Sequence, residues 1–179
     1  MNILVLGCSL NPDSNSQILA REAVEQLRAA GADEVTLIDL REKALPLCDG
    51  ESSDAATQAI AAAVRAAGAI IFAVPIYNYD VNAAAKNVVE HVGSAFEGKL
   101  VAFLCAAGGH GSYMSVMSLA NSLMLDFRCL IVPRFVYATG PCFVNGKIVN
   151  DQIVQRVRQL CEEVASLAKK LNPKSKLPV

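Results

Sequence analysis

The sequence predicts an α/β fold in which helices cover both faces of a parallel sheet. Short apolar segments of strand character alternate with longer segments of helical periodicity along the whole chain. Segments such as Ala69–Val74 contain no polar residue, which is typical of a strand buried on both faces. The 179 residues are enough for one domain with a substantial core, and neither a linker nor an internal repeat divides them.

Five strands are predicted from the apolar, β-branched segments. They are Asn2–Cys8, Val35–Asp39, Ala69–Val74, Leu100–Ala106 and Cys129–Val136. We expect the third strand to stop at Pro75, because proline cannot donate to a sheet ladder.

A helix is predicted after each strand. The helices are Asn15–Ala30, Asp54–Ala67, about Asn82–Ser94, Tyr113–Leu125 and about Asp151–Leu171. Gly31 and Gly68 are expected to end the first two, since glycine suits the residue after a helix. Residues 41–52 contain Pro46 and Gly50 and are expected to be irregular. A small hairpin around Asn145-Gly146 should cover Phe143–Ile148.

Five successive strand–helix units imply right-handed crossovers and helices on both faces of the sheet. Sequence does not set the order of the strands, but this length and count suit the doubly wound, flavodoxin-like order 2-1-3-4-5. We therefore expect one flavodoxin-like domain over residues 1–171, followed by a basic tail over 172–179.

The charge balance excludes several classes of partner. The chain has 16 basic and 17 acidic residues, a net charge of −1, so no nucleic-acid partner is expected. No apolar segment reaches the eighteen or so residues that a membrane-spanning helix needs. The first residues lack the basic start of a signal peptide, so no membrane association is expected either.

Cysteine usage indicates a reduced, cytoplasmic protein. The six cysteines form no C-x-x-C pair, and the two histidines are not near them in the sequence, so no metal site is expected. Cys8 and Cys105 lie in apolar segments, where a free thiol behaves as a small hydrophobic group.

Hydroxyl and amide side chains crowd the turn between the first strand and its helix. They are Ser9, Asn11, Ser14, Asn15 and Ser16. A helix N-terminus has unpaired N–H groups and a partial positive charge, so a phosphate can bind there without a lysine. The turn matches neither the P-loop nor the dinucleotide G-x-G-x-x-G pattern. Capping by Ser14 or Asn15 is the alternative, and we expect Asp13 to point to solvent.

Two further turns would complete a mononucleotide site at the carboxyl ends of the strands. Tyr77 and Asn78 follow the third strand and offer a planar face and an amide group to a flat heteroaromatic ring. After the fourth strand comes Gly108-Gly109-His110-Gly111, where glycines let backbone amides approach a ligand closely. For a flavin, such N–H groups would stabilise the anionic reduced ring.

These motifs resemble the NAD(P)H-dependent FMN reductases, a flavodoxin-like family that includes quinone and azo-dye reductases. The family pattern P-x-Y-N-x-S-x-P-x-x-L-K-N is matched from Pro75 to Asn87, and the first-loop pattern G-S-x-R-x-x-S-x-[NT] more loosely from Cys8 to Ser16. The resemblance extends from Met1 to about Ala168. Asn11 stands where the family has arginine, and Asp80 and Asn82 replace a serine and a proline beside the ring.

The resemblance implies an FMN cofactor, with NADPH or NADH as co-substrate. The first turn would bind the phosphate, and the ring would lie against Pro75, Ile76, Tyr77, Asn78, Gly108, Gly109 and His110. A hydride would pass to the flavin and then to a quinone, a second flavin or a similar small acceptor, in a ping-pong scheme without a catalytic side chain.

Family members commonly form homodimers or homotetramers, and we expect contacts through 82–94 and the helix from Tyr113. Met114, Met117 and Met124 are interpreted as core or subunit contacts. Tyr113 lines the ligand site or packs on its neighbours, and His91 is expected at the surface or in packing.

Two alternatives stay open at this point. One is a flavodoxin-type electron carrier that holds FMN without oxidising NAD(P)H, although such carriers are usually strongly acidic. The other is a flavin-free member of the family with a regulatory role, which the substitutions at Asn11 and Asp80 would favour.

Overall fold

The structure, a computed structural model, describes residues 2–43, 45–51 and 54–171. The sheet has the order β2-β1-β3-β5, and its fifth position is shared by β6 and β7, each of which pairs with β5. All these neighbours are parallel, as predicted. The strands are β1 (Asn2–Gly7), β2 (Glu34–Asp39), β3 (Ala67–Tyr77), β5 (Leu100–Ala107), β6 (Leu130–Ile131) and β7 (Val136–Thr139). The predicted order 2-1-3-4-5 is therefore confirmed.

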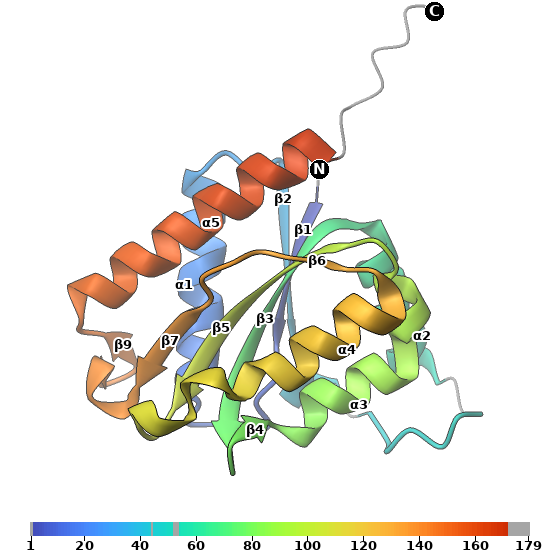
Figure 1. Ribbon diagram of the computed structural model, residues 1–179, viewed down its shortest axis with the longest axis horizontal. Helices are drawn as coiled ribbons and strands as arrows, with labels where there is room; N and C mark the ends of the chain where they lie inside the picture. Colours follow the sequence, from blue (N-terminus) through green and yellow to red (C-terminus); the bar gives the residue numbers. More distant parts are fainter. Residues whose placement is uncertain (1, 44, 52–53, 172–179) are drawn as a thin grey trace, which may run out of the picture.

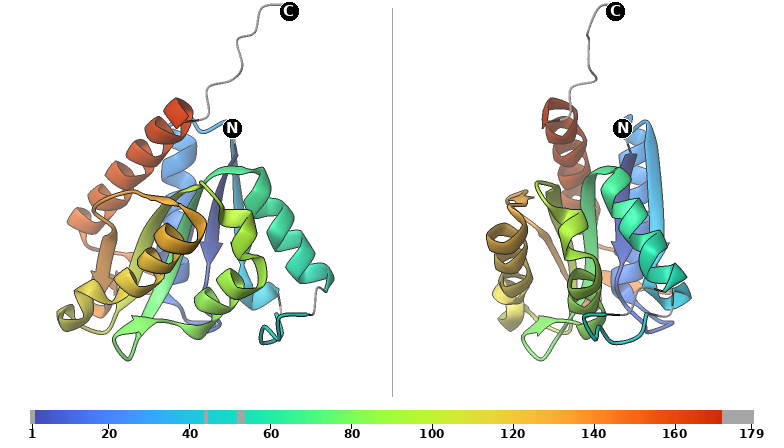
Figure 2. Two further views of the ribbon diagram at one scale, coloured as in Figure 1. Left: turned by 45° about the vertical axis from the view of Figure 1, so that its right-hand side comes forward. Right: turned by 90° about the vertical axis from the view of Figure 1, so that its right-hand side faces the viewer.

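Helices cover the sheet on both faces (Figures 1 and 2). On one face α1 (Asn15–Ala29) and α5 (Asp151–Leu171) pack over a core that includes Leu27, Ile71 and Val157. On the other face lie α2 (Ala55–Ala66), α3 (Ala83–Val92) and α4 (Met117–Phe127), over a core that includes Ile60, Phe72 and Leu123. The short 3₁₀ helices are η1 (Leu40–Glu42), η2 (Gly93–Phe96), η3 (His110–Val116) and η4 (Gly140–Cys142). No described helix is long and apolar enough to cross a membrane.

The first helix ends at the predicted glycine. Gly31 has φ of +76°, its N–H donates to Arg28 O, and the N–H of Ala32 donates to Leu27 O. These two bonds form a Schellman motif, which needs a residue in the left-handed conformation and therefore favours glycine.

The third strand is longer at both ends than predicted. β3 begins at Ala67, so Gly68 lies inside the strand and does not cap α2. It also continues through Pro75, which pairs with Ala106, to Tyr77. The prediction that the strand ends at Pro75 is therefore wrong. After Tyr77 the chain turns back into β4 (Asp80–Val81), which pairs with Ile76 and Tyr77 in antiparallel fashion.

The segment after the fourth strand also departs from prediction. Residues 110–116 form the 3₁₀ helix η3, so the α-helix begins at Met117 and not at Tyr113. The predicted fifth strand is divided, since Pro133 lacks an N–H group and Arg134 has φ of +62°. The hairpin of β8 (Phe143–Val144) and β9 (Lys147–Ile148) forms around Asn145-Gly146 as predicted. The predicted tail, 172–179, lies outside the described residues.

Gly93 gives a test of packing at the end of α3. A Cβ added to Gly93 would lie 2.3 Å from Phe127 Cζ, and Phe127 packs against the core. We expect Gly93→Ala to lower the free energy of unfolding by about 1–3 kcal/mol through overpacking, measured by urea denaturation. Gly109→Ala is the control, since nothing lies within 4 Å of its added Cβ. Equal stability of the two variants would contradict this packing.

The six cysteines divide into two classes of expected reactivity. Cys8 and Cys105 are fully buried, and burial raises the pKa of both thiols. Burial also raises the pKa of Cys129 to about 11 and that of Cys161 to about 12.

Only the thiolate reacts with disulfide reagents, so these four residues should resist labelling at neutral pH. The half-buried Cys48 and Cys142 should react first. We expect the fast phase of labelling by 5,5′-dithiobis(2-nitrobenzoate) to disappear in the Cys48→Ala/Cys142→Ala variant. A fast phase that survives this double substitution would contradict the assignment.

Candidate functional site

A cavity of about 550 Å³ opens at the carboxyl ends of the central strands. In Figure 1 this is the lower end of the molecule, where the hairpin of β4 projects. The turns after β1, β3 and β5 all contribute to its lining, and the turn after β7 adds Gly140. The lining residues are Asn11, Asp13, Ser14, Asn15, Ser16, Pro75, Ile76, Tyr77, Asn78, Ala106, Ala107, Gly108 and Gly140.

The first wall is the turn that leads into α1. Ser14 is the N-cap, and its Oγ accepts a hydrogen bond from the Gln17 N–H at 3.2 Å and lies 2.9 Å from Ser16 Oγ. Within the described residues, the N–H groups of Asn15 and Ser16 donate to no backbone carbonyl. The predicted alternatives therefore combine: Ser14 caps the helix, and two free amides still line the cavity.

Before the N-cap, hydrogen bonds between side chains and backbone stabilise the turn. The Asn11 N–H donates to Ser9 Oγ at 3.2 Å, and the Asp13 N–H donates to Asn11 Oδ1 at 3.0 Å. Ser9 is buried and does not line the cavity. Asp13 is exposed as expected, yet it also contributes to the rim of the cavity.

The second wall, the turn after β3, is a tight hairpin. Tyr77 pairs with Asp80, so Asn78 and Tyr79 form a two-residue turn with φ of +51° and +63°. Positive φ at both positions is typical of a type I′ turn. Asparagine suits this conformation, whereas tyrosine is strained there. The pairing of β3 with β4 holds the hairpin, and the rings of Tyr77 and Tyr79 remain exposed.

Asn82 joins the first wall to the second. Its Nδ2 donates to the carbonyl of Cys8 at 2.7 Å, and its backbone N–H donates to Pro75 O at 3.2 Å. Asn82 is buried and forms the N-cap position of α3 without a side-chain capping bond. Asp80 does not cap α3 either, because its Oδ1 accepts from the Val81 N–H and from Ser118 Oγ. Sequence reasoning placed Asn82 beside the ring and missed this cross-connection.

The third wall is the turn after β5, which begins at Gly108, and a cluster of aromatic side chains packs against it. Tyr137 Oη donates to Gly109 O at 2.7 Å and lies 2.7 Å from Ser112 Oγ. The ring of Tyr113 packs on those of Phe135 and Tyr137, with centroids 4.8 and 5.3 Å apart. Tyr113 therefore packs on its neighbours and does not line this cavity.

The structure brings most of the predicted site residues together, but three lie outside the cavity lining. These are Ser9, Gly109 and His110, the last of which is exposed at the start of η3. Asp13, which was expected to point to solvent, is also in the lining, and sequence reasoning missed Ala106, Ala107 and Gly140. Their position at the ends of the fourth and fifth strands was the available signal.

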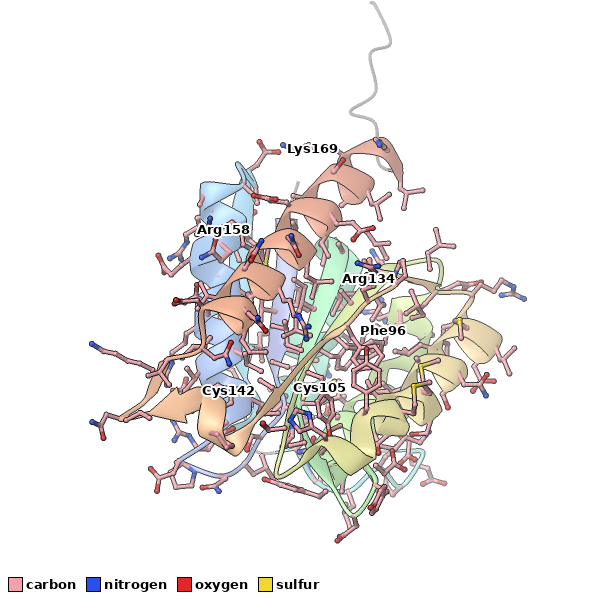
Figure 3. The ribbon with its side chains drawn as sticks, turned by 60° about the vertical axis from the view of Figure 1, so that its left-hand side comes forward. Phe96, Cys105, Arg134, Cys142, Arg158 and Lys169 are labelled. Atoms are coloured by element: carbon pink, nitrogen blue, oxygen red, sulfur yellow. The ribbon has the colours of Figure 1, made fainter. Side chains whose placement is uncertain are left out.

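Another cavity, of about 480 Å³, lies between η3, the β6–β7 connection and α5. Its lining includes Arg134, Arg156 and Tyr113, and of the residues that the sequence offered for the ligand site it contains Tyr113 alone. Figure 3 shows Arg134 higher in the view than Cys142. The candidate site is therefore the strand-end cavity.

The donors and shapes of the strand-end cavity fit a mononucleotide with a flat ring. Free helix amides, hydroxyls and side-chain amides gather at one end, and Tyr77, the Pro75 segment and Gly108 form the other. A Cβ added at Gly108 or Gly140 would meet nothing within 4 Å, so both glycines leave space for a ligand. The described residues contain no cluster of three or more metal-ligating side chains.

Comparison with known proteins agrees with this geometry. Residues 1–141 match the family described as NADPH-dependent FMN reductase. A relative named NAD(P)H-dependent FAD/FMN reductase, from Geobacillus thermodenitrificans strain NG80-2, is 24% identical over 172 residues, which cover 93% of each chain. A relative named NADPH azoreductase, from Bacillus sp. strain OY1-2, is 24% identical over 155 residues, 84% of each chain.

A solved structure of an oxidoreductase from Corynebacterium diphtheriae has the same fold. It superposes with a TM-score of 0.81 at 19% identity, over 94% of this chain and 97% of that one.

Proposed function

Since this chain belongs to the NADPH-dependent FMN reductase family, we propose that it is an NAD(P)H-dependent flavin reductase that uses the strand-end cavity. Bound FMN would supply the ring that accepts a hydride from NADPH or NADH, and a small molecule such as a quinone or a second flavin would be the final acceptor. The observation that supports this best is the convergence of amide donors, a tyrosine hairpin and a glycine turn on one cavity of about 550 Å³.

Each wall has a separate task in this proposal. The amides of Asn15 and Ser16 hold the phosphate, with the helix N-terminus as the source of positive charge. Tyr77 and Asn78 hold one edge of the ring, and the backbone at Gly108 approaches the other. FMN supplies the hydride-accepting ring when it is bound, so the protein contributes position and electrostatics.

The side chains that line the cavity are consistent with a protein that positions the flavin and does not itself take part in bond making. Its lining contains no histidine, cysteine, lysine or arginine, and its one carboxylate, Asp13, lies at the exposed rim. The Ser14 and Ser16 hydroxyls contact each other, and the lining has no histidine or lysine to activate either one as a nucleophile or to act as a buried general base. Hydride transfer between two stacked rings needs neither.

Flavin titration and turnover test the proposal. We expect the purified protein to bind FMN, whose flavin ring absorbs at about 450 nm, and to oxidise NADPH or NADH in the presence of menadione. Binding without turnover would support the electron-carrier alternative. Failure to bind any flavin would support the flavin-free alternative, and either outcome would overturn the reductase assignment.

We also propose that the protein is a homodimer or homotetramer whose contact includes η3 and α4. Met114, Met117 and Met124 are exposed and not in the core, and Leu125 on the same helix is 73% exposed. Contiguous exposed apolar side chains are typical of an interface. We expect Met117→Lys/Leu125→Lys to lower the mass measured by light scattering after gel filtration. A wild-type protein that is already monomeric at micromolar concentration would contradict this proposal.

A cytoplasmic location completes the proposal. All six cysteines are free thiols in the structure, which supports a reducing compartment.

A further inference from the structure

We propose that this cavity does not select for the phosphate of its flavin, and that it accepts riboflavin nearly as well as FMN. The inference rests on the proposed function and concerns the substrate class of the same site. Its basis is the charge of the cavity. Of all the lining residues only Asp13 carries a formal charge at neutral pH, and that charge is negative.

The hydrogen bonds at the phosphate end use acceptor oxygens and one hydroxyl donor, and every donor that remains is neutral. Ser14 Oγ accepts from the Gln17 N–H and contacts Ser16 Oγ. Asn11 Oδ1 accepts from the Asp13 N–H. The donors left for a ligand are the Asn15 and Ser16 backbone amides, one of the two hydroxyls and the side-chain NH₂ groups, including Nδ2 of Asn11. Neutral hydrogen bonds of this kind are weaker than charge-assisted ones, so they offset less of the cost of desolvating a phosphate dianion.

No cation among the described residues compensates inside the cavity. Two basic residues, Arg41 and Lys43, line a different groove together with Leu10 and Leu45. Arg41 is also paired with Asp39 at 3.6 Å. Asp13 therefore opposes a phosphate without a guanidinium or ammonium group to balance it, and only the helix N-terminus and neutral donors favour the anion.

Riboflavin avoids this opposition and keeps the remaining contacts. Its ring would use the same Tyr77, Asn78 and Gly108 wall as that of FMN. The hydroxyl groups of its ribityl chain can pair with the same amides and hydroxyls that would face the phosphate. The ring thus supplies most of the affinity for either flavin.

The test is a parallel titration of flavin-free protein with riboflavin and FMN, followed by quenching of flavin fluorescence. In the wild type we expect the two dissociation constants to agree within about tenfold, or 1.4 kcal/mol. Asn11→Arg and Asp13→Asn should each tighten FMN binding about three- to tenfold and change riboflavin binding less than about twofold. Asp151→Asn removes a carboxylate at the start of α5, outside the cavity lining, and should change neither dissociation constant.

The outcomes separate the inference from the function on which it rests. If both flavins bind but FMN binds more than about a hundredfold tighter, the inference fails and the reductase assignment stands. The inference also fails if Asn11→Arg or Asp13→Asn shifts both flavins equally, because the effect is then not on the phosphate. If neither flavin binds, the proposed function fails together with the inference.

Discussion

Replacing Asn15 by aspartate is expected to weaken FMN binding at least about tenfold without destabilising the protein. Asn15 is the first residue of α1 and lines the phosphate end of the cavity. Aspartate has almost the same shape, and a carboxylate in the first turn interacts favourably with the helix dipole. The same charge repels a phosphate at that terminus, so ligand affinity and stability should move independently.

Fluorescence titration and thermal unfolding would measure these two quantities. Riboflavin, which lacks the phosphate, should bind Asn15→Asp within about threefold of its wild-type affinity. Gln152→Glu is the matched control, because it adds the same charge near the N-terminus of α5, away from the cavity. An Asn15→Asp variant that binds FMN like the wild type would show that the phosphate does not lie at this helix.

Replacing Asn82 by alanine is expected to lower both stability and flavin affinity. The substitution removes the hydrogen bond to the buried Cys8 carbonyl, and a carbonyl left without a partner costs about 1–3 kcal/mol. It also removes the connection between the turn after β1 and the hairpin after β3. We therefore expect a fall of several degrees in the melting temperature and an FMN dissociation constant more than about tenfold higher.

Asn87→Ala provides a matched control on the same helix. Asn87 is as buried as Asn82, and its side chain makes two hydrogen bonds where that of Asn82 makes one: its Oδ1 accepts from the Cys48 N–H at 2.9 Å, and its Nδ2 donates to Pro46 O at 2.8 Å. These bonds fix residues 46–48 to α3 and do not reach the strand-end cavity. Asn87→Ala should therefore lose stability and keep its FMN affinity. If both variants lose affinity equally, the role of Asn82 is only general stability.

The course of β3 shows where a local signal was insufficient. Pro75 suggested the end of the strand because proline lacks a donor. The parallel pairing with Ala106 tolerates it, and the strand then continues into a hairpin with β4. The sequence Tyr77-Asn78-Tyr79-Asp80 lacks the glycine that usually marks a type I′ turn, so the left-handed conformation of Tyr79 had no local signature.

In the site, too, some features depend on neighbouring residues and others on residues far apart in the chain. The hydroxyl cluster before α1 predicted a helix N-terminus with free amides, because capping is decided by neighbouring residues. The bond of Asn82 to Cys8 and that of Tyr137 to Gly109 join residues 74 and 28 positions apart in the chain. Neither pair has a spacing or motif that sequence reasoning could use.

The sequence by itself determined the α/β class, the alternation of elements and the end of the sheet at which the turns gather, because hydrophobic periodicity and helix caps depend on residues close in the chain. Tertiary structure decided where β3 turns, which side chains face the strand-end cavity, and which amide connects its walls. Those features depend on pairing between segments far apart in the chain, and no local sequence pattern determines the free energy of such contacts.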